Sequence, residues 1–203
     1  AGHRAIAKID DKVIDELSLQ LNSMKGDQRL RALQVIMLMG KESEVEARLL
    51  QLMKDPDHKV RATVVRALGL TRTTSAVKAL LIALQDPDRR VKANAIEAFE
   101  ELKHPRVIDL IHPLMRHPDN RVRGNAVKAM IVLGRLAEAV PVLDGMMKDP
   151  EPMMRRTAIW VIKESGIKDA QLRLQELLLR EKDPEVAGKA RDAFVKLKEK
   201  ETS

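Results

Sequence analysis

Apolar residues recur along the chain at offsets of zero, four, seven and eight residues, in a block that returns about every 31 residues. Residues with these offsets lie on one face of an α-helix. A second segment with the same periodicity separates successive blocks, so each repeat is predicted to be a pair of antiparallel helices, A and then B. One pair cannot bury its own apolar face, and the pairs must therefore stack. The first apolar residues of the B blocks are Leu30, Val60, Val91, Val122, Met154 and Val186.

Capping residues set the boundaries of the predicted helices. Aspartates precede four B helices, and glycines follow the apolar run in four of them, where N-caps and C-caps are expected. The aspartates are Asp27, Asp55, Asp86 and Asp149, and the glycines are Gly40, Gly69, Gly134 and Gly166. The six predicted pairs span residues 10–41, 43–71, 74–103, 105–135, 137–167 and 169–200, within a single all-α domain over residues 1–203. Because the chain begins Ala-Gly-His, without Met, we expect it to be a fragment of a longer chain.

The repeated phrase resembles a known family. The stretch "DPDHKVRATVVRALG" at 55–69 returns in varied form at 86–100, 117–131 and 149–163. It is similar to the short HEAT repeat of the kind found in phycobilin lyase-type proteins. The resemblance implies a right-handed α-solenoid of about six hairpins whose B helices line the concave surface. It is weakest in the first repeat, where Gln34 occupies a core column, and in the last.

A basic residue follows the first apolar position in five of the six B helices: Arg31, Arg61, Lys92, Arg123 and Arg155. A phosphate-binding stripe is one interpretation of this column. The column lies at the edge of the apolar face, however, beside the aspartates of neighbouring repeats, and arginine pairs well with carboxylates. The resemblance implies the same pairing. We therefore predict a structural ladder of Asp55, Arg61, Asp86, Lys92, Arg123, Asp149 and Arg155, with one weaker rung where His117 replaces aspartate.

Other positions of the B helices face away from the core, and these form the predicted binding surface. A row of cations precedes the apolar positions, small residues lie beside it, and Trp160 with Met153 adds an apolar patch. The predicted partner-binding residues are Arg29, Lys59, Arg66, Arg90, Arg121, Lys128, Met153, Arg156 and Trp160. The competing interpretation is a solvated charged face without a partner.

Composition narrows the function. The net charge is +7 and the pI about 9.7, so acidic proteins, nucleic acid and lipid headgroups are all compatible partners. Aromatic residues make up only 1% of the chain, which leaves single-stranded nucleic acid few stacking platforms. The chain has no cysteine, which leaves the redox compartment open, and it has no apolar run of membrane-spanning length. We expect a cytoplasmic protein without membrane insertion.

Catalysis finds little support in the sequence. The five histidines lack metal-binding motifs, and three of them (His104, His112 and His117) are interpreted as surface or structural residues. No His-Glu pair of the kind that marks deoxyhypusine hydroxylase is present. We predict a non-catalytic scaffold, without metal or cofactor, that binds an acidic protein or peptide on its concave face. Binding to a nucleic-acid backbone is the first alternative, and a phycobilin lyase-type accessory role is the second.

Overall fold

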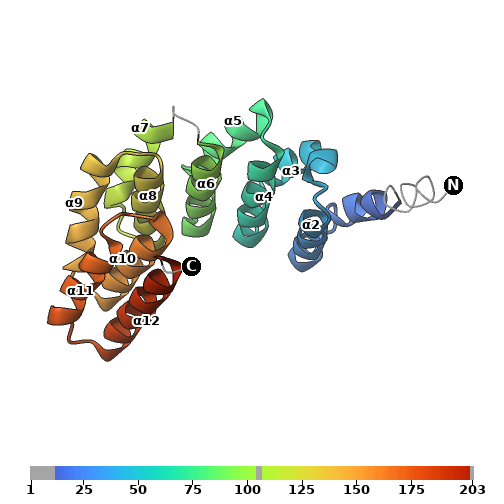
Figure 1. The fold of residues 1–203 in the computed structure, drawn as a ribbon. Helices are drawn as coiled ribbons and strands as arrows, with labels where there is room; N and C mark the ends of the chain where they lie inside the picture. The colour runs from blue at the N-terminus through green and yellow to red at the C-terminus, as the bar shows by residue number, and fades with distance from the viewer. Residues whose placement is uncertain (1–11, 104–106, 202–203) are drawn as a thin grey trace. The chain divides into compact units, whose positions relative to one another are not determined.

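The computed structural model describes residues 12–103 and 107–201, with side chains to residue 199. Every regular element in these ranges is helical, and no strand occurs in them (Figure 1). This confirms the predicted all-α class of a repeat solenoid. The contacts group the chain into two compact units, of which unit 1 ends at Leu102 and unit 2 begins at Lys103. The predicted boundary between the third and fourth helix pairs falls at this division.

Unit 1 stacks three B helices with shorter A elements behind them. The A elements are a helix over residues 12–20, the 3₁₀ segment η1 (Glu42–Val45) continued by α3 (Glu46–Leu52), and α5 (Thr74–Ala83). The B helices are α2 (Gly26–Met39), α4 (His58–Thr71) and α6 (Arg89–Leu102). Helix α4 packs on both α2 and α6, as Figure 1 shows, and on α3 and α5.

Unit 2 repeats the arrangement with three further pairs. Its A elements are α7 (Ile108–Ile111) continued by η3 (His112–Arg116), α9 (Leu136–Met147) and α11 (Ala170–Arg180). Its B helices are α8 (Asn120–Val132), α10 (Pro152–Ser165) and α12 (Pro184–Glu201). Helix α10 packs on α8 and α12. The first A helix of this unit changes to a 3₁₀ segment after one turn, where Pro113 has no N–H to donate, although His112 keeps helical dihedral angles.

The loops before the B helices correct the predicted caps. Asp57 accepts from the backbone N–H of Lys59, and Asp119 accepts from those of Arg121 and Val122, so these residues are the N-caps. Three of the four predicted caps lie two residues before the start of the helix cap, and their side chains accept hydrogen bonds within the loop instead. Asp55, Asp86 and Asp149 each accept from the N–H two residues ahead, and Asp27 lies inside the first turn of α2.

The glycine predictions are confirmed only in part. Gly40 and Gly166 end α2 and α10 with positive φ angles of 65° and 69°, a conformation that favours glycine. Gly69 does not end α4, which continues to Thr71 and ends at Arg72 with φ 56°. Gly69 instead lies where α4 approaches α6, since a Cβ atom built on it would lie 2.9 Å from the Cβ atom of Ala98. The fourth glycine, Gly134, follows α8 with φ 82°.

The core of the first repeat is displaced by two residues from the predicted register. Leu33 and Ile36 are fully buried, whereas the predicted core residue Gln34 is exposed and Leu38 is 87% exposed. The predicted first core residue, Leu30, is only half-buried. The displacement changes the role of every charged residue at the start of α2.

Candidate partner-binding faces

Buried arginine–carboxylate pairs join adjacent repeats within unit 1. Arg61 on α4 donates from Nε and Nη2 to the two carboxylate oxygens of Asp86, at 2.8 and 3.0 Å. Its Nη1 donates to the carbonyl of Asp55 at 2.8 Å. Arg29 makes the preceding rung, with its Nη2 atom 2.8 Å from the Asp55 carboxylate and a side chain that is 10% exposed. These fork geometries link the cap loop of one repeat to the helix of the previous one.

Arg29 therefore corrects two predictions. From the sequence, Arg29 is expected on the exposed binding face, and Arg31 is expected in the basic column that is interpreted as structural. In the structure Arg29 is 8% exposed and paired, while the Arg31 side chain is 76% exposed and lies 3.4 Å from Asp27. The physical reason is the two-residue displacement of α2, which turns Leu30 and Arg31 off the buried face.

Unit 2 has one strong pair and one weak pair. Arg155 donates from Nε and Nη2 to Glu181, at 2.7 and 2.8 Å, although the predicted ladder did not include Glu181. Arg123 reaches Asp149 only at 3.9 Å and donates instead to the carbonyl of His117 at 2.8 Å. His117 accepts from the N–H of Asp119 through Nδ1 at 3.0 Å, as Asp55 and Asp86 do in their loops.

The pairs shift the pKa of their members. Burial raises the pKa of Asp86, but hydrogen bonds from Arg61 and from the Asp88 N–H outweigh it, so the pKa lies below its ordinary value. Hydrogen bonds from Arg155 lower the pKa of Glu181 in the same way. Lys92, the predicted ladder member of α6, forms no ion pair among the described residues, and a lysine cannot make the two-pronged contact of an arginine.

Cap aspartates alternate in sequence with the exposed cations at the starts of the B helices of unit 1. Lys59 and Arg90 are exposed at the starts of α4 and α6, and Arg66 is exposed further along α4. The backbone N–H groups of Lys59 and Arg90 are each held at 2.8 Å by a cap aspartate, Asp57 or Asp88. The row that the sequence showed as a line of cations is thus interleaved with anions.

Unit 2 carries an aromatic patch. Trp160 on α10 is half-buried, and the ammonium of Lys128 on α8 lies 5.5 Å from the centre of its ring. Gly124 provides room for this arrangement. A Cβ atom built on Gly124 would lie 2.4 Å from Cγ2 of Thr157 and 3.7 Å from the indole. The absent side chain lets α10 place Thr157 and Trp160 directly against α8.

Further predicted binding residues lie on α8 and α10, the helices that carry Lys128 and Trp160. Met153 is 51% exposed in the first turn of α10. Arg156 pairs with Glu185 and has its Nη2 atom 3.7 Å from the Met153 sulfur. Arg121 is exposed in the first turn of α8. We call Arg121, Lys128, Met153, Arg156 and Trp160 the Trp160 patch.

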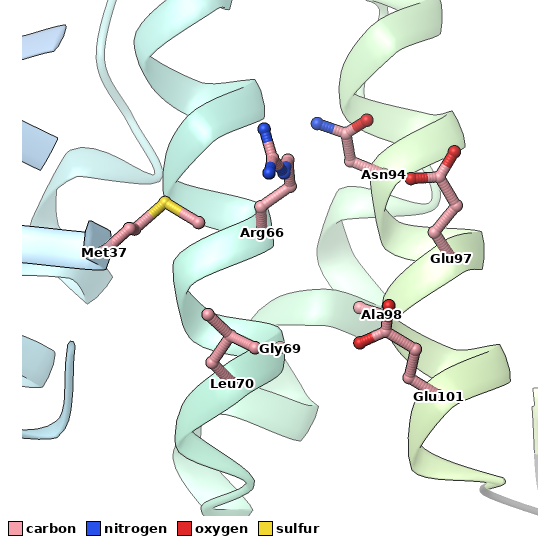
Figure 2. A pocket seen from close by; sticks show the side chains of 8 residues that line it. All are labelled: Met37, Arg66, Gly69, Leu70, Asn94, Glu97, Ala98 and Glu101. Carbon is pink, nitrogen blue, oxygen red and sulfur yellow. The ribbon is translucent and has the colours of Figure 1, made fainter. Parts of the chain in front are cut away.

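Sequence reasoning missed a groove in unit 1, shown in Figure 2. It encloses about 110 Å³ between the C-terminal halves of α4 and α6. Its lining residues are Met37, Arg66, Gly69, Leu70, Asn94, Glu97, Ala98 and Glu101. The signal for it was Gly69, which was interpreted as a helix end although a glycine inside a helix also marks close packing.

No metal-binding arrangement occurs in the described part of the chain, which contains no group of three His, Asp or Glu side chains placed to hold an ion. His58 lies 4.0 Å from Asp88, and His112 lies 3.5 Å from Glu138. His104, the third histidine of interest with His112 and His117, lies outside the described residues. None of the helices searched there is both long and apolar enough to span a bilayer.

Comparison with known proteins gives the following similarities. A model of HEAT repeats matches residues 14–93 and 77–149. The structure is similar to that of YIBA from E. coli, with a TM-score of 0.59 and 20% identity over 91% of this chain and 72% of that chain. It is also similar to a designed armadillo repeat protein solved in complex with the peptide (KR)4, with a TM-score of 0.51 and 18% identity over 88% and 98% of the two chains.

A third structure is the CpcE–CpcF complex of phycocyanin lyase from Nostoc, with a TM-score of 0.49 and 18% identity over 91% and 94% of the two chains. No protein of curated function matches the chain by sequence. These likenesses show the fold, and the lyase similarity is too low to support an argument about function.

Proposed function

Because the chain belongs to the HEAT repeat family, we propose that it is a non-catalytic scaffold for protein–protein interaction. We further propose that an acidic peptide or protein segment binds to the Trp160 patch of unit 2. The scaffold role is supported by the stacked helical pairs, which present exposed helix faces. The site itself rests on the chemistry of the patch.

The observation that carries the proposal is the placement of the Trp160 ring. A half-buried indole on a packed helix is a frequent energetic centre of interfaces, because it contributes a large apolar area with little loss of entropy. Three cations, Arg121, Lys128 and Arg156, lie on the same patch, and one of them pairs with Glu185. A segment with an apolar side chain flanked by carboxylates would match this arrangement of charges.

Trp160 is the only tryptophan in the chain, and there is no tyrosine, so its emission reports on the patch directly. The test is a titration of the whole chain with a short peptide that alternates Glu and Leu. We expect a saturable change in Trp160 emission. A peptide that alternates Lys and Leu should leave the emission unchanged.

Charge reversal identifies the contacts. The double variant Arg121→Glu and Lys128→Glu should weaken binding of the Glu-Leu peptide by about tenfold or more. Lys148→Glu, an exposed charge of the same unit outside the patch, is the matched control and should bind as wild type does. Equal affinities in all three proteins, with unchanged melting curves, would remove the Trp160 patch from the proposal.

Binding to a nucleic-acid backbone is the second candidate, supported by the net charge of +7 and by the exposed Lys59 and Arg90. Asp57 and Asp88 beside these cations weaken the case. A random DNA duplex titrated at increasing salt distinguishes the two. Binding to phosphates falls steeply as salt rises, whereas contacts to the indole persist.

A further inference from the structure

The groove of unit 1 differs in chemistry from the Trp160 patch. Its lower half is formed by Gly69 and Leu70 of α4 and by Ala98 and Glu101 of α6 (Figure 2). Small-molecule pockets usually enclose about 300–1,000 Å³. A groove of about 110 Å³ is therefore the size for a single side chain.

One wall of the groove is apolar and accessible. Leu70 is 49% exposed, and Met37 from α2 is half-buried beside it. Gly69 is buried where α4 approaches Ala98 of α6, and these two small residues form the bottom of the groove. An aliphatic chain entering the groove would lie against Leu70 and Met37 and cover surface that is now in water.

The opposite wall is acidic. Glu97 and Glu101 lie one helical turn apart in the last two turns of α6, and Glu101 is exposed. The last turn of α6 has no basic residue, and the carbonyl groups at a helix C-terminus add partial negative charge. A carboxylate at the C-terminal end of a helix lowers the stability of that helix, and a cation placed beside the carboxylate offsets this loss of stability.

We infer that this groove binds a lysine or arginine side chain of a partner protein. The aliphatic stem lies along Leu70 and Met37, and the charged end pairs with Glu101. Arg66 at the other end of the groove repels a second cation, so the groove takes one basic side chain in one direction. This site lies in unit 1, has the opposite charge preference to the Trp160 patch, and does not depend on that patch binding anything.

The probe is N-acetyl-lysine N-methylamide, added to the whole chain with ¹³C-labelled methionine methyl groups. The chain carries +7 overall and repels a cationic probe, so binding reports local complementarity. We expect a saturable shift of the Met37 methyl resonance. N-acetyl-norleucine N-methylamide, which has the stem without the charge, should bind about fivefold to tenfold more weakly.

Glu101→Gln should reduce the affinity for the lysine probe to that for the norleucine probe. Glu164→Gln is the matched control, because Glu164 occupies on α10 the position that Glu101 occupies on α6. Leu70→Ser tests the apolar wall and should weaken both probes. The inference is overturned if the Met37 methyl shift does not saturate, or if Glu101→Gln and Glu164→Gln bind the lysine probe equally.

The outcome is separate from that of the proposed function. Trp160 emission should not respond to the lysine probe, and the Met37 methyl should not respond to the Glu-Leu peptide. Either site can therefore fail without affecting the other.

Discussion

Units 1 and 2 are built from the same repeat but place their glycines differently. In unit 1 the glycine between adjacent B helices is Gly69, in the C-terminal half of α4, facing Ala98. In unit 2 it is Gly124, in the N-terminal half of α8, facing Thr157 and Trp160. The first allows a close contact of α4 and α6 at the bottom of a groove that Glu97 and Glu101 also line, and the second provides room for an indole beside a lysine. One missing methyl group thus selects where each stack exposes a specific surface.

The ladder also differs between the units. Arg61–Asp86 is a two-pronged pair with side chains 14% and 11% exposed, whereas Arg123 and Asp149 are 3.9 Å apart and each 23% exposed. Arg61→Ala should lower the free energy of unfolding by about 2 kcal/mol, because it leaves a partly buried carboxylate with only the hydrogen bond from the Asp88 N–H. Arg123→Ala should cost about 1 kcal/mol. Urea unfolding followed by circular dichroism measures both, with the exposed Lys78→Ala as control. Equal costs would show that the closer pair contributes no more than the longer one.

The glycine contrast has its own test. Gly124→Ala should destabilise by about 2 kcal/mol, since the new methyl overlaps Thr157, and Thr157→Ser should restore part of the loss by removing Cγ2. Gly69→Ala brings a methyl to 2.9 Å from the Cβ atom of Ala98, so α4 and α6 must shift slightly, but the substitution gains about 1 kcal/mol of helix propensity, and its net cost should stay below that of Gly124→Ala. Thermal melts of the wild type, Gly124→Ala, Gly124→Ala with Thr157→Ser, and Gly69→Ala check the order of these stabilities. A larger loss for Gly69→Ala than for Gly124→Ala would reverse the comparison.

Acid should weaken the pairs of both units. The pKa of Asp86 and that of Glu181 are lowered in the folded protein, so their contribution is complete above the unfolded-state pKa and is lost as pH falls through the lower folded value. The ordinary pKa of a glutamate such as Glu181 is 4.5, and the stability of the protein should therefore decline as the pH falls from about 5 downward. Glu181→Gln should flatten the unfolding free energy against pH in this range. Glu176→Gln, an exposed control on α11, should leave the slope unchanged.

The smallest expected effect concerns the ring contact in unit 2. Lys128→Met keeps the aliphatic stem and removes the charge, so stability should fall by about 0.5 kcal/mol. The emission maximum of Trp160 should shift as the ammonium leaves the ring face. Lys148→Met is the comparison, and an identical emission spectrum in all three proteins would exclude a direct Lys128–Trp160 contact.

The sequence predicted the architecture because helices and repeats are specified by residues that lie close together along the chain. Helical periodicity, the period of about 31 residues and the resemblance to HEAT repeats are all confirmed by the fold and the family match. The ladder arginines of the second, fourth and fifth repeats were also named in advance, because each follows a strongly apolar residue in a well-formed phrase.

Only the tertiary structure decided the register of the first repeat and the surfaces that the two units expose. The sequence favoured Arg31 for the ladder column and Arg29 for the binding face, and the structure reverses the two. The choice was made by burial of Leu33 and Ile36 and by the distance to Asp55, which lies 26 residues further along the chain. From the sequence, Gly69 could either end a helix or allow a neighbouring helix to pack closely. Only the position of Ala98 on α6 shows that the second role is the one that occurs. Periodicity states which face of a helix is apolar, whereas the fit of one helix against another depends on side chains a whole repeat away.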